Sequence, residues 1–207
     1  GEYRFNENAG TTTADGSASA NGGTFAGGAA WVGGRSAAAG SAASFDGSGR
    51  IELAADLNRW LGASGTVAFW LRTTQTGNDT MWLAPGVLGV ESAGDGNDVF
   101  WGWLDGSGRI GVQAGDVAGA KSAAPVNDGQ WHHVALTRDH VTGRVEVFVD
   151  GVSSGLGTSG TGVKTTPFRS IGRIDDTGGT PTGFNGAVDD LLVFDRVLTA
   201  DEIRALT

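Results

Sequence analysis

The sequence contains no cysteine in its 207 residues, which excludes disulfide bonds, thiolate zinc sites and a cysteine nucleophile, although not export from the cell. No run of 18 apolar residues occurs, so the sequence predicts no membrane-spanning helix. Basic residues are few: 14 Lys and Arg stand against 23 Asp and Glu, for a net charge of -9. Because nucleic acid and anionic membranes bind basic surfaces, we expect neither as a partner.

Glycine is abundant, with 37 residues against only 4 prolines. Of the 23 acidic residues 17 are aspartates, which favour turns, whereas glutamate favours helices. Together with many Val, Thr, Phe and Trp residues, this composition predicts an all-β protein of short strands and tight turns. The length suits one domain over residues 1–207, which can bury about 70% of its unfolded surface without cross-links.

The order of strand signals predicts how that domain is organised. Residues 10–44 are rich in Gly, Ala and Ser, but Phe25 and Trp31 interrupt them, which favours irregular early strands over a disordered linker. The segment 131–137 is expected to pair with 144–149, and Asp-Gly pairs supply turns between strands. Thr199 and Glu202 form a capping-box pattern that predicts one short C-terminal helix. The predicted strands are 50–53, 66–72, 99–104, 109–113, 131–137, 144–149 and 186–194.

An ordered set of short motifs runs along the whole chain. These motifs are Tyr3-x-Phe5-x-Glu7, Phe45-Asp46-Gly47, Phe69-Trp70-Leu71, Trp131-His132-His133-Val134-Ala135, Val147-Phe148-Val149-Asp150-Gly151, Ile171-Gly172, Gly186-Ala187-Val188-Asp189-Asp190 and Asp195-Arg196-Val197-Leu198-Thr199-x-x-Glu202-Ile203. In this order they resemble the bacterial laminin G-like domains of the concanavalin A-like lectin/glucanase group. The resemblance implies a two-sheet antiparallel jelly-roll sandwich with a concave face and, commonly, a bound calcium ion. It also implies a module of a secreted or cell-surface protein, such as a glycoside hydrolase, lyase, sialidase or adhesin.

Catalysis is not favoured by the residues. A retaining glycosidase needs two carboxylates about 5–5.5 Å apart, and the nearest pattern is Glu146 with Asp150. Asp150 is expected in a hairpin turn, and Glu146 is expected to face solvent. The Gly-x-Ser-x-Gly match at residues 151–155 and the Gly-x-Gly-x-x-Gly match at 155–160 lie in an expected loop without a following helix, so neither predicts its chemistry. Adjacent His132 and His133 point to opposite faces of a strand, which disfavours a zinc site.

A calcium site is predicted from the final strand. Asp189 and Asp190 interrupt an otherwise apolar segment, and a carboxylate buried there needs a cation or hydrogen-bond donors. The resemblance implies that Asp189 ligates calcium, with carbonyl groups of the N-terminal segment completing the shell; Asp15 and Asn21 are weaker candidates. The alternative is a surface Asp189 paired with Arg196 or Arg173. Residues 95–98 form a second acidic loop, which either holds calcium or is a solvated turn.

The 7 tryptophans direct the prediction of a ligand surface. Trp70 and Trp131 are expected in the core, whereas Trp101 and Trp103, two residues apart on one strand, are expected to share a face on which a sugar ring stacks. The alternative is that Trp101 fills the core. Trp82 is a further platform candidate, Arg109 and Arg173 are candidates for binding a carboxylate, and the expected hydroxyl-binding neighbours are Glu91, Asp95, Asn97, Asp98 and Gln113.

These observations favour a non-catalytic carbohydrate-binding module of a secreted bacterial protein, monomeric within a larger chain, that binds a polysaccharide or glycan and holds a structural calcium ion. The alternative is a protein-binding or spacer module without affinity for sugars. A glycan hydrolase or lyase is the third and least supported hypothesis.

Overall fold

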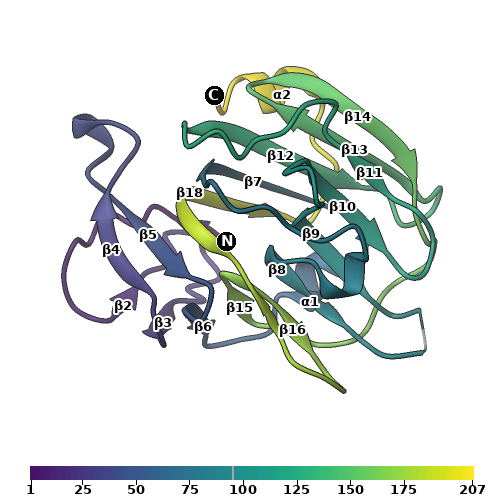
Figure 1. Ribbon diagram of the computed structural model, residues 1–207, viewed down its shortest axis with the longest axis horizontal. Helices are drawn as coiled ribbons and strands as arrows, with labels where there is room; N and C mark the ends of the chain where they lie inside the picture. The colour runs from purple at the N-terminus through teal and green to yellow at the C-terminus, as the bar shows by residue number, and fades with distance from the viewer. Residues whose placement is uncertain (95) are drawn as a thin grey trace.

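The computed structural model describes residues 1–94 and 96–207 and has two large β-sheets packed face to face (Figure 1). The larger, eight-stranded sheet has the strand order β14-β13-β12-β7-β18-β5-β4, with β1 paired to β18. Its strands are β1 (Glu2–Tyr3), β4 (Ala30–Gly33), β5 (Ser41–Asp46), β7 (Gly65–Arg72), β12 (His132–Arg138), β13 (Arg144–Val149), β14 (Val152–Thr158) and β18 (Asn185–Phe194).

The facing six-stranded sheet has the order β11-β10-β9-β8-β16-β17. Its strands are β8 (Gly86–Glu91), β9 (Val99–Leu104), β10 (Ile110–Ala114), β11 (Ala120–Lys121), β16 (Arg173–Asp176) and β17 (Thr182–Gly183). The pair β8 and β16 is parallel, which departs from the predicted antiparallel pattern, because β16 follows a crossover from a different sheet.

A four-stranded sheet adjoins this arrangement with the order β15-β6-β3-β2. It consists of β2 (Thr12–Thr13), β3 (Gly23–Ala26), β6 (Arg50–Leu53) and β15 (Ser170–Ile171), so the Gly- and Ala-rich early segment does form strands. The helical elements are all short: η1 (Ala37–Ala39), α1 (Asn58–Leu61), η2 (Met81–Leu83) and α2 (Ala200–Arg204). In the described residues, no helix has the length and apolar character that crossing a bilayer requires.

Alternation along β7 defines the two faces of the larger sheet. Val67, Phe69 and Leu71 enter the core between the large sheets, whereas Ala68 packs on the outer face against α2. The helix begins with the predicted capping box: the Thr199 side chain accepts the Glu202 backbone N–H, and the Glu202 side chain accepts the Thr199 N–H. This box fixes the start of α2, which lies over part of the outer face.

The predicted all-β sandwich and the pairing of residues 131–137 with 144–149 are confirmed. Two further expectations were wrong. Residues 152–158, expected as a loop, form the edge strand β14 after the Asp150-Gly151 turn. Trp70 and Trp131, expected in the core, lie half-buried instead, because their neighbours along the chain fill the inner face.

Candidate functional site

The predicted platform of Trp101 and Trp103 does not form. Gly102 has φ +82, and the pairing of β9 with β10 shifts by one residue there, so the alternation of side chains is broken by a bulge. Trp101 is fully buried in the main core, whereas Trp103 packs with Phe100 in a separate cluster and is 5% exposed. The two indoles therefore lie on opposite faces, and the alternative that Trp101 fills the core is correct.

Trp103 is covered by an ion-paired group rather than open to a ligand. The Lys121 ammonium lies 5.6 Å from the centre of the Trp103 ring and 2.9 Å from an oxygen of Asp105. Asp105 is fully buried and also accepts the Arg109 Nε at 2.9 Å. Burial opposes ionisation of Asp105, but its hydrogen bonds to Lys121 and to the 107–109 turn outweigh burial and lower its pKa to about 2. Arg109 thus supports a turn and is already paired.

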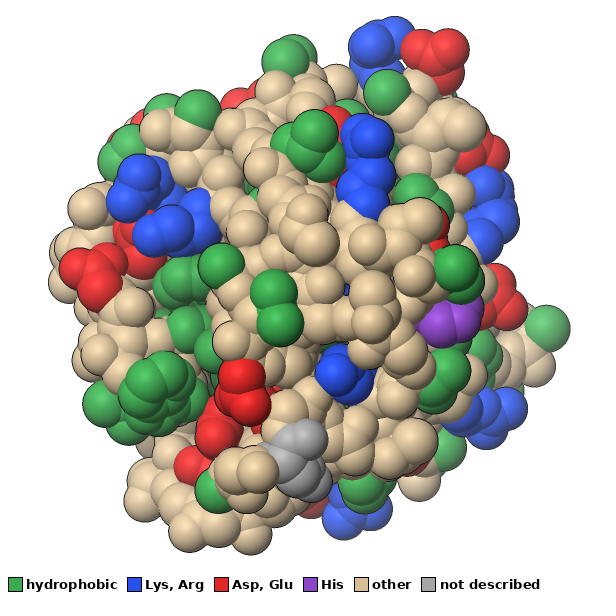
Figure 2. All heavy atoms as spheres, turned by 90° about the vertical axis from the view of Figure 1, so that its right-hand side faces the viewer, with side chains coloured by type: hydrophobic (Ala, Val, Ile, Leu, Met, Phe, Trp, Pro, Cys, Tyr) green, Lys and Arg blue, Asp and Glu red, His purple; other side chains and the backbone are tan. Residues whose placement is uncertain are grey.

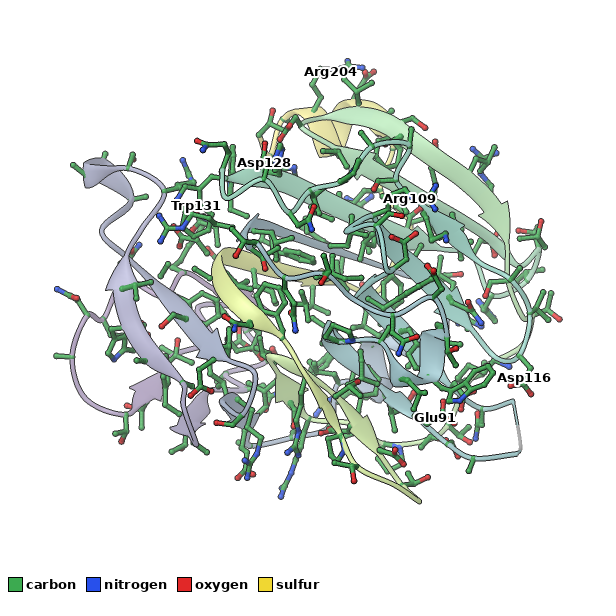
Figure 3. The ribbon with its side chains drawn as sticks, viewed as in Figure 1. Glu91, Arg109, Asp116, Asp128, Trp131 and Arg204 are labelled. Atoms are coloured by element: carbon green, nitrogen blue, oxygen red, sulfur yellow. The ribbon has the colours of Figure 1, made fainter. Side chains whose placement is uncertain are left out.

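The predicted polar neighbours lie at the opposite end of the same sheet. Figure 3 shows Glu91 and Asp116 near one corner of the molecule, well away from Arg109. Asn97 exchanges hydrogen bonds with Thr165, buried Asp98 accepts the Ser92 N–H at 2.7 Å, and the Gln113 side chain donates to the Gly115 carbonyl. Asp95 lies outside the described residues. Asn97, Asp98 and Gln113 therefore hold loops at this end of the sheet through hydrogen bonds. Asn97 and Asp98 precede β9, and Arg109 follows it.

Trp82 and Arg173, the two other predicted ligand residues, also lie away from the rest of the predicted set. Trp82, on η2, keeps 56% of its surface exposed beside Leu83 at 54%. Arg173 lies on β16, where its Nε donates to Asp175 at 2.7 Å and to Ser170 at 3.2 Å. Trp82 thus remains an exposed indole, but the predicted residues do not converge on it as one site.

A different aromatic surface lies on the outer face of the larger sheet. The register of β7 with β12 pairs Trp70 with His133, and continuing it by one residue brings Trp131 beside Arg72. The Arg72 guanidinium carbon lies 4.9 Å from the centre of the Trp131 ring, and that of Arg35 lies 4.8 Å from the centre of the Trp70 ring. We name these five residues, Trp70, Trp131, Arg72, Arg35 and His133, the tryptophan–arginine face. Figure 3 shows Trp131 beside Asp128 at the border of this surface.

The position of α2 explains why this face is open. Two residues along the strands from Trp70 and His133 lie Ala68 and Ala135, which are covered by Ile203 of α2 and by Leu198, just before the helix. The row of Trp70 is bordered instead by the 34–40 loop, whose Arg35 lies over the Trp70 ring. Strand β14 differs in character, because its apolar side chains Val152 and Leu156 are exposed, at 67% and 61%. On the side of the molecule that Figure 2 shows, hydrophobic side chains are scattered among acidic and basic ones.

Asp189 lies next to the tryptophan–arginine face. Its partner across β18 and β7 is Trp70, and Asp190, at φ +47, forms a bulge that turns Asp189 to the outer face. Asp189 is fully buried and accepts the backbone N–H groups of Asp190 at 2.9 Å and Arg35 at 3.3 Å. Burial raises the pKa of Asp189 to about 6. The expected alternative, a surface Asp189 paired with Arg196 or Arg173, was wrong, since Arg196 pairs with Glu202 and Arg173 with Asp175.

The surroundings of Asp189 offer further oxygen atoms. A Cβ placed on Gly34 would lie 3.1 Å from Asp189 Oδ2, 3.2 Å from the Ala39 carbonyl oxygen and 3.2 Å from that of Gly40. A carboxylate and two carbonyls therefore converge where Gly34 lacks a side chain, and such oxygens suit a calcium ion. In the described part of the chain, no three His, Asp or Glu side chains gather as a metal cluster, so this donor set depends on backbone carbonyls.

Asp15 and Asn21 belong to another network. Asp15 accepts hydrogen bonds from the Glu2, Ser17 and Asn21 backbone N–H groups and from the Ser19 hydroxyl. These bonds outweigh its burial and lower its pKa well below the usual range. The Asn21 side chain exchanges hydrogen bonds with the backbone of Ala55. Both side chains hold the N-terminal loop and are already saturated by protein donors or acceptors.

The two acids considered for catalysis are engaged in local structure. Glu146 accepts the Arg144 guanidinium at 2.8 Å and the Ser153 hydroxyl at 2.6 Å. Asp150 accepts the His133 backbone N–H at 2.9 Å and contacts the His132 ring at 2.9 Å. Burial opposes ionisation of Glu146, but the two bonds lower its pKa, which is the opposite of what a general acid needs.

Sequence reasoning missed the tryptophan–arginine face although a signal was present. In any regular strand Arg72 shares a face with Trp70, and an arginine marks a face that meets solvent. The core assignment of Trp70 overlooked this neighbour. Arg35, from the loop before η1, carries no comparable signal, because only the fold brings it over Trp70.

Comparison with solved structures finds the same fold in other proteins. Domain 4 of an extracellular GH43 arabinanase from Geobacillus stearothermophilus, solved in complex with arabinotriose, matches with a TM-score of 0.69 at 22% identity, over 99% of this chain and 96% of that one. A Trypanosoma rangeli sialidase in complex with sialic acid matches with a TM-score of 0.65 at 17% identity, over 99% of this chain and 32% of the enzyme. At these identities the likeness shows the fold alone.

Sequence comparison gives a shorter match and a family. A Rattus norvegicus protein with sushi, von Willebrand factor type A, EGF and pentraxin domains is 33% identical over 90 residues, which span 39% of this chain and only 2% of that protein. The model of the laminin G-like family described as the concanavalin A-like lectin/glucanases superfamily matches residues 45–204, well over half of the chain. The chain therefore belongs to the concanavalin A-like lectin/glucanase superfamily.

Proposed function

We propose that this domain is a non-catalytic carbohydrate-binding module that holds a polysaccharide on the tryptophan–arginine face. The observation that carries the proposal is the pair of half-buried indoles, Trp70 and Trp131, on one sheet face with an arginine over each ring. Indole faces and edges bind the apolar C–H surfaces of sugar rings, and the guanidinium donors beside them suit ring hydroxyls. The engaged state of Glu146 and Asp150 supports binding over hydrolysis.

The similarity to the arabinanase domain supports this proposal and suggests the first ligand to test. That domain has almost the same length as this chain and was solved with arabinotriose. We therefore propose arabinan as the first polysaccharide in a panel, and an extracellular or cell-surface setting within a larger protein. A protein-binding or spacer module remains the competing assignment and predicts no retention by any glycan.

Affinity gel electrophoresis tests the site directly. The wild type, W70A, W131A and W82A are run through gels containing arabinan and unrelated neutral polysaccharides, after thermal melts establish that each variant is folded. We expect each of W70A and W131A to weaken binding about tenfold or more, since a lost ring stack costs about 1.4 kcal/mol. W82A is the matched control, because it removes an indole that is 56% exposed on η2, away from the tryptophan–arginine face.

The outcomes separate the assignments. Loss of retention in W82A with normal retention in W70A and W131A would move the site to η2. An unretarded wild type on the whole panel would favour the spacer module. Release of reducing sugar by the wild type would return hydrolysis to consideration.

We also propose that Asp189 holds a structural calcium ion together with the carbonyls of Ala39 and Gly40. The support is the buried carboxylate beside the gap left by Gly34. Calcium would stabilise the negative charge that burial disfavours, and would tie the 34–40 loop, with Arg35, to β18. We expect calcium to raise the melting temperature of the chelator-treated wild type and to leave that of D189N unchanged. Equal responses of the two proteins, or none in either, would contradict this proposal.

A further inference from the structure

The outer surface of the four-stranded sheet carries a shallow trough of about 540 Å³. Thr12, Thr24 and Glu52 lie on one face of β2, β3 and β6, since each is the cross-strand partner of the next. Small side chains at Ala20, Gly22, Gly23 and Ala54 keep this surface low. The volume falls within the range of about 300–1,000 Å³ that is usual for small-ligand sites, and hydroxyl groups line it.

Arg169 is the cation that this trough offers to a ligand. Its guanidinium takes part in no ion pair within the described residues, and its backbone N–H donates to Asp175 at 3.2 Å. Arg169 also borders a second hollow of about 240 Å³ on its other side, which Asp56 and Phe168 line. The Arg169 side chain thus lies between two hollows, and no ion pair of the described residues occupies its guanidinium.

The nearby charges are otherwise balanced in pairs. Arg50 binds Glu52 through Nε at 2.8 Å, and Arg173 binds Asp175 at 2.7 Å. The bond and charge of Arg50 lower the pKa of Glu52, and the charges of Arg169 and Arg173 act in the same direction. Asp56, in the second hollow, accepts the backbone N–H groups of Asn58 and Phe168. Among the described residues that line the trough, Arg169 is therefore the positive charge that is not paired with an acid.

We infer that the trough is a second binding site, distinct from the tryptophan–arginine face, and that it accepts a sugar acid. The carboxylate of the sugar would be bound by the planar fork of Arg169, and its hydroxyls by Thr12, Thr24 and Glu52. Arginine suits this role because its donors match both oxygens of a carboxylate. A neutral sugar would leave the guanidinium without an anionic partner, so the site should prefer a uronate.

Amide chemical-shift titrations test this site with simple probes. D-Galacturonate and D-glucuronate are compared with methyl α-D-glucoside and acetate, in the wild type, R169Q and A54F. We expect the uronates to shift amides of β3 and β6 in the wild type, with at least tenfold weaker binding in R169Q. A54F fills the trough without changing charge and should weaken binding as much. R204Q is the control, because Arg204 is an exposed arginine on α2.

Each contrary result has a distinct meaning. Equal binding of methyl α-D-glucoside would show a neutral-sugar site, and equal binding of acetate would show an anion site only. Undiminished uronate binding in R169Q, or no shift in the wild type, would overturn the inference. W70A and W131A should bind uronate normally, and R169Q should keep its retention by arabinan, so this site and the proposed function can fail separately.

Discussion

The adjacent residues His132 and His133 titrate in opposite directions because they occupy different environments. Burial opposes protonation of His132, but bonds to Asp150 and Asp128 outweigh it and raise its pKa. Burial lowers the pKa of His133 to about 4, since its buried Nδ1 has no partner and its ring packs at 5.4 Å from Trp70. The predicted opposite orientation of the two rings is confirmed by their pairing with Leu71 and Trp70.

These two pKa shifts predict how the free energy of unfolding changes with pH on the acidic and the alkaline side of about pH 6.5. A raised His132 pKa adds stability that is present below about pH 6.5 and lost as pH rises through the folded value. A lowered His133 pKa costs stability as pH falls from about 6.5 toward 4, because the unfolded state binds the proton first. Urea unfolding across this range should show that H132Q flattens the alkaline limb and H133Q the acidic limb. The reverse assignment, or parallel profiles, would contradict it.

Arg138 is a fully buried cation that ties two loops to β12. Its Nη1 donates to the carbonyls of Gly62 and Ala63 at 3.0 and 2.7 Å, and its Nη2 to those of Gly160 and Gly162 at 3.1 and 2.7 Å. Its burial lowers its pKa to about 10, so it stays charged at neutral pH.

Removing this guanidinium takes a donor from four carbonyls, and its bonds to those of Gly62 and Gly160 are buried. We expect R138M to lower the unfolding free energy by about 2–4 kcal/mol, and R138K to recover only part of that, because an ammonium cannot reach both loops as a fork. R144Q, at an arginine whose side chain is 60% exposed, should change it by less than about 1 kcal/mol. Equilibrium urea denaturation measures all three, and equal losses in R138M and R144Q would refute the assignment.

At the scale of elements, the bulge in β9 decides where Trp103 points. A Cβ at Gly102 would lie 3.1 Å from Val87 and 3.2 Å from Phe69, and the residue holds φ +82. Gly10 has φ +75, and a Cβ added there would have no atom within 4 Å. A substitution at Gly10 therefore measures the backbone strain alone. We expect G10A to cost about 1 kcal/mol and G102A at least about 1 kcal/mol more, by urea denaturation. Similar losses in both would mean that the core absorbs the extra methyl group.

Local alternation was enough to predict most strands and not enough to predict the site. The bounds of β6, β9 and β13 match the predicted segments, because β6 and β13 alternate regularly and β9 is a continuous apolar run. The glycine bulge at Gly102 inverted the face of Trp103, since the sequence alone does not distinguish a strand glycine from a bulge. The edge strand β14 was missed because its glycines and serines are typical of a loop, and it is held as a strand by pairing with β13.

At the scale of the whole molecule, the two proposed sites differ in electrostatic character. The protein carries a net charge of -9, so an anionic ligand approaches the trough only through the local field of Arg169. Salt screens such exposed charges over about 10 Å at 0.1 M, whereas ring stacking depends little on salt. Raising NaCl from about 20 to 300 mM should weaken uronate binding about threefold or more and leave arabinan retention nearly unchanged. Equal salt sensitivity would contradict this separation.

The last strand of the chain, β18, lies between β7 and β5 in the middle of the larger sheet. During synthesis the ribosome therefore exposes β5 and β7 with their pairing edges unsatisfied until residues 185–194 emerge. Contacts of such high sequence separation make closure slow, and the domain is vulnerable to aggregation until β18 has emerged. Premature termination before β18 should thus yield insoluble product, however complete the earlier hairpins are.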